Sequence, residues 1–331
     1  MSRYASAHKN PQGPGDARPT ALQIIKDEHA EGTLKGKVIV VTGTSSGIGV
    51  ETVRALSGTG AKFFLTARDL KKAQKALEGF FDADRMELVE MDQTSFGSVR
   101  AAAKYILDKT DKVNILIENA GVMSVQNLEF TEDGHEMQFG TNYLSHFLLF
   151  QLLRPALLAA ITPELNSRVV VLASSAHHNG GINESDNYNF QKGGYEPLRA
   201  YAQSKTATMY LANEIERQYG VQGLHATSVH PGGIMTELAR HLPDSQLQAI
   251  VSNDIVKNLL KSPEQGAATT VWAAIGKQWE NAGGRYLADC EEAPPCENHN
   301  PLFGKGYVAH AYDPEREARL WKDSLKIVGL E

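Results

Sequence analysis

Tyr201 and Lys205, four residues apart, are the side chains whose types and spacing could carry out acid–base chemistry. In a helix, positions four apart share one face, so the Lys205 ammonium would lie beside the Tyr201 phenol. A nearby cation lowers the pKa of a phenol, which is about 10 when unperturbed and too high for efficient proton exchange at neutral pH. The pair therefore predicts proton transfer with a substrate oxygen, although the same spacing also arises by chance.

A glycine-rich segment upstream indicates what such a pair would work with. Residues 42–49 read Thr-Gly-Thr-Ser-Ser-Gly-Ile-Gly, and they follow a β-branched run and precede a helical apolar pattern. Glycines let a backbone approach a pyrophosphate, and the start of the next helix offers it free N–H groups. The segment predicts dinucleotide binding, with a purely structural turn as the alternative.

The residue after the second expected strand indicates which dinucleotide binds. Arg68 occupies the position where an acidic residue would bind the ribose 2′-hydroxyl of NAD. A guanidinium pairs instead with the 2′-phosphate of NADP, and Asp69 is expected to cap the following helix. The sequence therefore predicts NADP(H), with a solvated surface arginine as the alternative interpretation of Arg68.

The composition favours one large domain that acts on a small molecule. The chain has 331 residues, 42% of them hydrophobic, and a net charge of −6. This length supports one large core, and the negative charge gives no basic surface that would select nucleic acid. Polar residues and Pro155 interrupt the longest apolar stretch, residues 144–161, so we expect a buried helix there and no membrane span.

The cysteines and the start of the chain add further limits. The chain has two cysteines, Cys290 and Cys296, which favours a reducing compartment, and we expect a cytoplasmic protein. Together with His299 they lack the usual zinc-ligand spacing, so no metal site is predicted. Residues 1–35 are expected to form a polar leader that is flexible at its start, where prolines and glycines are frequent.

Strands and helices alternate along the rest of the chain. Apolar runs predict strands at residues 38–41, 62–67, 86–91, 113–117, 169–172 and 224–229. Strands of this kind, separated by helices, predict a parallel sheet covered on both faces. We therefore expect an α/β fold with a doubly wound, Rossmann-type sheet, in a single domain at residues 36–331 that ends in a helical extension.

The order and spacing of these motifs resemble the short-chain dehydrogenase/reductase family. The matching motifs are Thr42 to Gly49, Asn119-Ala120-Gly121, Asn142, Ser174, the Tyr201 and Lys205 pair, and Pro231-Gly232. Residues 138–149 and 168–178 further resemble the retinol dehydrogenase-like branch and its fungal relatives. Glu118 departs from the family, which has asparagine there, and we expect this change to affect the packing of the central strand more than catalysis.

The resemblance implies a role for each matched residue. Tyr201 would be the general acid/base, and Lys205 would lower its pKa and hold the nicotinamide ribose. Ser174, rather than its neighbour Ser175, would hydrogen-bond the substrate oxygen, and Asn142 would anchor a water that supplies protons. The residues implied to bind the cofactor, besides Tyr201 and Lys205, are Gly43, Ser45, Ser46, Gly47, Ile48, Gly49, Arg68, Asp92, Asn119, Ala120, Gly121, Pro231, Gly232 and Thr236. For Asp92, a helix cap is the alternative.

The sequence thus predicts an NADP(H)-dependent oxidoreductase that interconverts an apolar or aromatic ketone or aldehyde and its alcohol. Lid segments near residues 176–198 and 233–262 would wall the substrate pocket. We expect His177 and His178, in the first of these segments, to be structural. Two alternatives stay open: a non-catalytic NADP-binding sensor, and an isomerase or dehydratase on the same fold. Relatives often pair through the helices that carry Asn142 and Tyr201, so a homodimer is expected, and the fungal resemblance suggests secondary metabolism.

Overall fold

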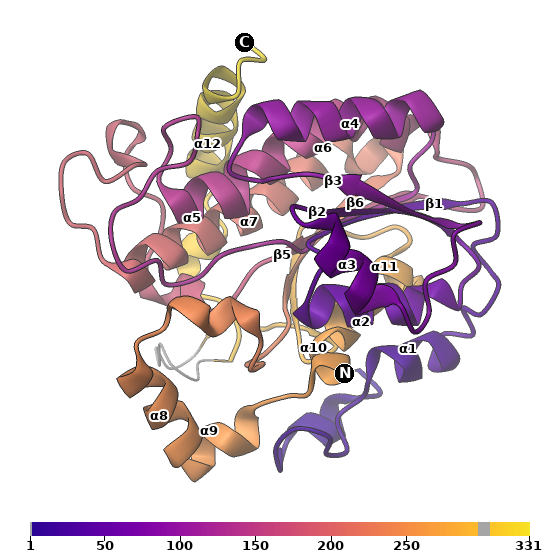
Figure 1. Ribbon diagram of the computed structural model, residues 1–331, viewed down its shortest axis with the longest axis horizontal. Helices are drawn as coiled ribbons and strands as arrows, with labels where there is room; N and C mark the ends of the chain where they lie inside the picture. Colours follow the sequence, from indigo (N-terminus) through magenta and orange to yellow (C-terminus); the bar gives the residue numbers. More distant parts are fainter. Residues whose placement is uncertain (1, 297–304) are drawn as a thin grey trace.

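An eight-stranded sheet forms the centre of the computed structural model, which describes residues 2–296 and 305–331 (Figure 1). Its order is β3-β2-β1-β4-β5-β6-β7-β8, and only the β7–β8 pair is antiparallel. The strands are β1 (Val38–Thr42), β2 (Lys62–Ala67), β3 (Met86–Glu90), β4 (Ile115–Glu118), β5 (Ser167–Leu172), β6 (Leu224–His230), β7 (Arg285–Ala288) and β8 (Glu291–Glu292). The predicted doubly wound α/β fold is confirmed. β7 and β8 were not predicted, because neither is a long apolar run.

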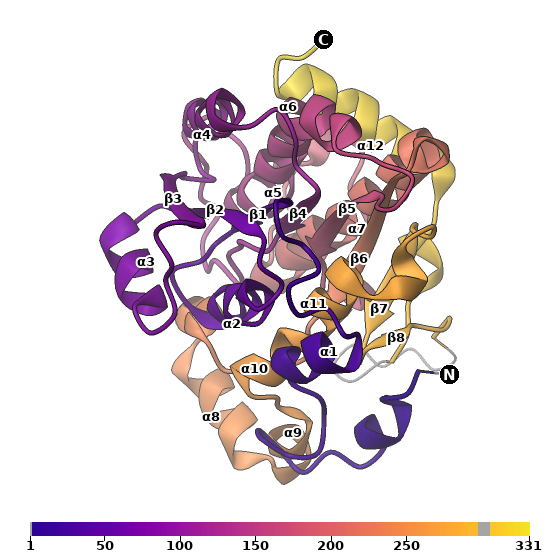
Figure 2. The same cartoon turned by 90° about the vertical axis from the view of Figure 1, so that its right-hand side faces the viewer.

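Helices cover both faces of the sheet (Figures 1 and 2). One face packs against α4 (Phe96–Lys109), α6 (Ser145–Ala159) and α7 (Pro197–Tyr219), and the other against α2 (Gly47–Ser57), α3 (Leu70–Leu77) and α11 (Ala268–Ile275). Double coverage explains why β1 and β5 are buried along their whole length. The chain order reverses between β1 and β4, and this switch point opens the crevice in which such sheets bind ligands.

Shorter elements connect this framework. The short helices are α1 (Ala21–Asp27), α5 (Met137–Phe139), α8 (Asp244–Ser252), α9 (Asp254–Leu259) and α10 (Pro263–Gly266), with a π-helical turn, η2 (Gly140–Leu144), directly before α6. The 3₁₀ turns are η1 (Ala5–His8), η3 (Ser175–Asn179), η4 (Ser185–Asn187), η5 (Gly220–Gln222), η6 (Glu237–His241), η7 (Lys277–Trp279) and η8 (Ala309–Ala311).

The C-terminal helix α12 (Pro314–Ile327) packs on α6 and α7. Trp321 meets Phe147 edge-on at 5.0 Å between ring centroids, and Asn213 of α7 donates to Glu317 Oε1 at 2.7 Å. Every residue of α7 from Ala200 to Ile215 is buried within one chain. The expected homodimer through the helices that carry Asn142 and Tyr201 stays a prediction.

The leader lies against the body of the molecule, whereas its composition predicts a flexible start. Ile24 and Ile25 of α1 are buried and join the core beneath α2 and α11, and Tyr4 is also buried. Arg18 is 4% exposed and finds backbone carbonyl partners. The few apolar side chains and one arginine thus hold a segment whose glycines and prolines alone indicate flexibility.

Candidate active site

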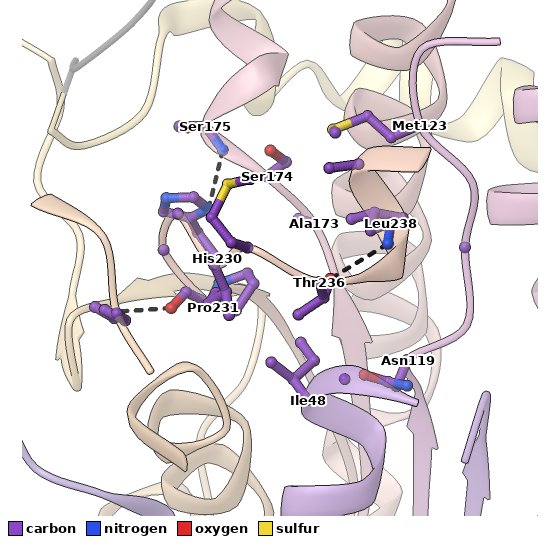
Figure 3. A pocket seen from close by; sticks show the side chains of 18 of the residues that line it. Ile48, Asn119, Met123, Ala173, Ser174, Ser175, His230, Pro231, Thr236 and Leu238 are labelled. Atoms are coloured by element: carbon purple, nitrogen blue, oxygen red, sulfur yellow. Dashed lines mark hydrogen bonds between the residues drawn. The ribbon is translucent and has the colours of Figure 1, made fainter. Parts of the chain in front are cut away.

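A cavity of about 1490 Å³ opens at the carboxyl ends of the central strands (Figure 3). All the predicted site residues line it except Asn142 and Lys205. These two lie directly behind the lining, since a Cβ placed on Gly121 would be 2.9 Å from Asn142 Oδ1 and 3.9 Å from Lys205 Nζ. The structure therefore brings the separate sequence motifs together in one place.

The glycine loop forms a cradle that side chains would fill. Gly43 has a φ of +73°, and a Cβ on Gly49 would lie 2.3 Å from the Gly43 carbonyl oxygen, so neither position accepts a larger residue without movement. Ser46, at the N-cap of α2, directs its hydroxyl to Glu237 and makes no side-chain cap. The first N–H groups of α2 are thereby left for an anionic ligand, as a pyrophosphate site requires.

A buried network joins this loop to the neighbouring strand and to α6. The Thr42 hydroxyl oxygen accepts the N–H groups of Asn119 at 2.9 Å and Ala120 at 3.0 Å, and it lies 2.9 Å from His146 Nε2. Because the hydroxyl already accepts twice, its proton goes to His146 Nε2, and Nδ1–H then donates to the Asn142 carbonyl at 2.9 Å. Burial lowers the pKa of His146 to about 4, so the ring is neutral. Sequence reasoning missed His146.

Asn142 ties the central strands to the helix that carries the tyrosine. It lies in the π-helical turn η2, where its Oδ1 accepts from Val122 N at 2.8 Å. Its Nδ2 donates to the Val122 carbonyl and to Ser204 Oγ, each at 2.9 Å, and Ser204 donates to the Tyr201 carbonyl at 2.8 Å. The side-chain amide thus has a protein partner for each of its hydrogens. The predicted water-anchoring role stays a prediction.

Tyr201, Ser174 and Lys205 form the reactive group. Tyr201 is 5% exposed, and burial raises its pKa to about 12, against a hydrogen bond from Ser174 that lowers it. Lys205 Nζ lies 5.7 Å from the centre of the tyrosine ring and donates to the Leu172 carbonyl at 2.6 Å. Burial lowers the pKa of Lys205 to about 7.

The expectation that Lys205 lowers the pKa of the Tyr201 phenol stays a prediction. Helical spacing does put Lys205 beside Tyr201. In the protein without a bound cofactor, however, the net effect on the pKa of the phenol is the increase caused by burial. The reason is that desolvation penalises the charged forms of both groups: it raises the pKa of the acid and lowers that of the base. It is the Ser174 hydroxyl that lowers the pKa of Tyr201.

Charged residues surround the far end of the cavity, after β2 and β3. Arg68 has a 72% exposed side chain, with its Nε 3.9 Å from Asp92 Oδ2, and Asp92 Oδ1 accepts from Thr94 N at 2.9 Å. Asp69 caps α3 by accepting from Lys72 N at 2.9 Å, as predicted. Lys72 is a second cation of this rim and pairs with Glu237 across the cavity mouth. It was missed, because its partner Glu237 lies far along the chain.

The segment after β6 closes the opposite side (Figure 3). The Pro231 carbonyl accepts from Lys261 Nζ at 3.2 Å, and Lys261 also pairs with Asp289 at 2.8 Å. Thr236 reaches the glycine loop, since its Cγ2 would be 3.3 Å from a Cβ on Gly47. Lys261 and Asp289 were also missed, because they become neighbours only through the unpredicted strand β7.

The two expected lid segments differ. Residues 233–262 line the cavity with apolar side chains, which are Ile234, Met235, Leu238, Leu242, Ile250, Val256, Leu259 and Leu260. Of residues 176–198, only Leu198 does so. Tyr188 and Phe190 of that segment are buried, and His177 Nδ1 lies 2.7 Å from the Ser174 carbonyl oxygen. Tyr188 and Phe190 of the first segment therefore pack on the core, and the assignment of residues 176–198 as a lid stays a prediction.

Two further expectations concern Glu118 and metal ions. Glu118 is buried at the end of β4, and both of its carboxyl oxygens lack a hydrogen-bond partner within residues 2–296 and 305–331. Burial raises its pKa well above the usual range, and it does not line the cavity. Cys290 is buried and His299 lies outside the described residues; those described contain no cluster of three or more His, Cys, Asp or Glu that could hold a metal ion.

A doubly wound sheet with a glycine cradle at its switch point, and a buried tyrosine beside that cradle, is the arrangement of a nicotinamide-dependent oxidoreductase. The chain belongs to the short-chain dehydrogenase/reductase family: the family model described as short chain dehydrogenase matches residues 37–247. Like that family as a whole, it binds a nicotinamide cofactor and acts on CH–OH or C=O groups.

Individual relatives agree with this assignment and with the retinol dehydrogenase-like branch. The chain is 47% identical to short-chain dehydrogenase/reductase prx1 of Penicillium roqueforti, over 99% of this chain and 95% of that one. It is 34% identical to human retinol dehydrogenase 13, over 91% and 87%. A solved structure of a putative uncharacterized protein from Mycobacterium paratuberculosis superposes with a TM-score of 0.68 at 27% identity, over 95% and 98%. Within the described part of the chain, no helix is long and apolar enough to cross a membrane.

Proposed function

We propose that this protein is an NADP(H)-dependent oxidoreductase that interconverts a bulky apolar or aromatic ketone or aldehyde and its alcohol. The observation that carries the proposal is the buried Tyr201, with the Ser174 hydroxyl on its phenol, at the wall of a cavity that also contains the glycine cradle. A substrate oxygen between the two hydroxyls would meet a preorganised pair of donors.

The residues divide the chemistry between them. The bound cofactor supplies or accepts the hydride. In the reducing direction Tyr201 donates its phenolic proton to the substrate oxygen, and Ser174 holds that oxygen in place by a hydrogen bond. Burial lowers the pKa of Lys205 to about 7, so this side chain is able to exchange a proton near neutral pH. It would return a proton to Tyr201 after the phenol has given its own to the substrate. Asn142 fixes this group by its bonds to Val122 and Ser204.

The charges at the cavity rim support NADP(H) as the cofactor. Arg68 and Lys72 both line the cavity after β2, where a 2′-phosphate would lie. Asp69, which could otherwise contact a ribose, is used as the cap of α3. Asn119 fits the adenosine side, because its Oδ1 is buried without a partner in the described chain while its Nδ2 holds the Thr42 and Gly43 carbonyls.

The size and lining of the cavity support a bulky apolar substrate. Its 1490 Å³ exceeds the roughly 300–1,000 Å³ of ordinary ligand pockets. That volume would also have to hold the cofactor, and an apolar part of the lining comes from residues 233–262 and Met123. Charged side chains such as Glu237, Arg240 and Lys261 also line the cavity, so it is the apolar stretch of the lining that favours an uncharged carbonyl compound.

The test is a cofactor-oxidation assay with NADPH and a panel of aliphatic, polycyclic and aromatic carbonyl compounds. Tyr201→Phe is expected to lower kcat about 10³-fold while the Kd for NADPH stays within about twofold, because the change removes only the transferable proton. Turnover that survives in Tyr201→Phe would contradict the mechanism. NADPH binding without turnover of any compound would favour a non-catalytic sensor, and product formation without net cofactor oxidation would favour an isomerase or dehydratase.

A further inference from the structure

The leader reaches the same cavity as the catalytic tyrosine. Five of its residues line the wall, which are Ala5, His8, Lys9, Pro11 and Arg18. His8 is buried, and its Nδ1 lies 3.2 Å from Asp289 Oδ1, the carboxylate that also holds Lys261. The leader is therefore joined, through one shared carboxylate, to the loop that would contact the nicotinamide.

Arg18 caps the end of the lid helix α9. The last carbonyls of a helix have no partner within it and require donors from elsewhere. The Leu259 carbonyl accepts from Arg18 Nη1 at 2.9 Å, the Leu260 carbonyl accepts from Arg18 Nη2, and the Asn258 carbonyl accepts from Gly13 N at 3.0 Å. The guanidinium is itself held by Asp16, whose Oδ1 accepts from Arg18 Nε at 2.8 Å.

The rest of the lid has little else to hold it. Neither α8 nor α9 has a buried residue. The lid ends at the backbone bond from Lys261 N to the Gly233 carbonyl, at 2.8 Å. Figure 2 shows the leader running beside α9 at the edge of the molecule. Because packing contributes so little, the position of α9 depends on the carbonyl bonds at its end.

We propose that leader residues 5–18 are a specificity element that walls the substrate side of the cavity and, through Arg18, holds the lid over a bulky substrate. This inference rests on the proposed function for the nature of the substrate. Arg18 is a positioning residue, because it acts through the carbonyls of α9. A small carbonyl compound would bind without the lid, whereas a bulky one would lose contacts with Val256, Leu259 and Leu260.

The first test is hydrogen–deuterium exchange of the full chain, which needs no turnover. Arg18→Gln is expected to speed exchange in residues 254–261 about tenfold and to leave exchange in the sheet unchanged. A tenfold change corresponds to the free energy that is lost with a hydrogen bond from a charged group. Arg3→Gln is the matched control, since Arg3 is a leader arginine that donates to the Asp27 carbonyl on the exposed surface. Arg18→Lys keeps the positive charge but lacks the forked N–H donors of the guanidinium, so an intermediate exchange rate is expected. Unchanged exchange in Arg18→Gln would overturn the proposal.

The second test measures equilibrium binding of a polycyclic ketone and of cyclohexanone to the NADP⁺-loaded protein by calorimetry. Arg18→Gln is expected to weaken the polycyclic ketone about tenfold and to leave cyclohexanone and NADP⁺ within about twofold. Equal weakening of both ketones, or a wild-type protein that binds neither, would overturn the specificity role. Failure of the proposed catalysis alone would look different: both ketones would bind as expected, but no NADPH would be oxidised.

Discussion

The two walls of the cavity are built in opposite ways. The catalytic wall is α7, in which every residue from Ala200 to Ile215 is buried and which α12 supports from behind. The lid wall, α8 and α9, has no buried residue and depends on polar bonds at its ends. Side chains that do chemistry must be held closely, whereas a wall that only encloses a substrate tolerates change. The same kind of substitution should therefore have different consequences on the two walls.

The largest effect is expected behind the catalytic wall. Trp321→Ala removes a ring that packs on Phe147 and Phe150, and the free energy of unfolding should fall by about 4 kcal/mol. Urea unfolding measures this, and size-exclusion chromatography with light scattering shows whether the newly uncovered surface of α6 causes association. Trp321→Phe is the control and should lose far less. A loss below about 1 kcal/mol from Trp321→Ala would mean that α12 does not stabilise the helices on this face of the sheet.

Acid is expected to have the next largest effect on stability, through His146 of α6. Burial lowers the pKa of His146 from 6.5 to about 4, so its contribution to stability is complete above pH 6.5 and is lost as the pH falls toward 4. A shift of this size corresponds to about 3 kcal/mol, because the unfolded chain binds the proton and the folded chain does not. Burial lowers the pKa of His230 in the same direction, also to about 4. Urea unfolding at pH 7 and pH 4.5 measures the combined loss.

The matched variant for this prediction is His146→Gln, which has no group that titrates in this range. Its unfolding free energy should change less between pH 7 and pH 4.5 than that of the wild type, and His177 and His230, whose pKa values burial also lowers, should contribute to the remaining slope. An identical pH dependence in both proteins would show that His146 is not held neutral, and the proton arrangement inferred for Thr42 and Asn142 would be wrong with it.

A smaller loss is expected from Thr42→Val, which keeps the shape of the side chain but removes its hydroxyl. The N–H groups of Asn119 and Ala120 and the Nε2 of His146 would lose a partner, at a cost of about 2 kcal/mol. Thr44→Val is a matched control in the same loop, because the Thr44 hydroxyl makes a single bond, to the Thr66 carbonyl at 3.2 Å. Urea unfolding measures the free energy lost in each variant. Equal losses would show that the Thr42 network contributes no more to stability than the single hydrogen bond of Thr44.

The sequence predicted the catalytic wall much better than the lid wall. Tyr201 and Lys205 share a helix face, and the glycine loop lies between a strand and a helix, so local spacing was enough to identify them. Lys261, Asp289 and Arg18 were missed because each is defined by a partner far along the chain, as in the bonds from Arg18 to residues 259 and 260. Of residues 176–198, only Leu198 lines the cavity, because composition alone does not tell a residue that lines a cavity from one that packs in the core.

The smallest effect is expected on the lid itself, and it tests the comparison most directly. Ile255 on α9 is 71% exposed, so Ile255→Ser removes an apolar side chain that contributes little burial. The free energy of unfolding should change by less than about 0.5 kcal/mol, as for surface positions in general. A loss above about 2 kcal/mol would mean that Ile255 is covered by a contact outside the single chain, and the lid would then be an interface. Urea unfolding at two protein concentrations separates these outcomes, because only an interface makes stability depend on concentration.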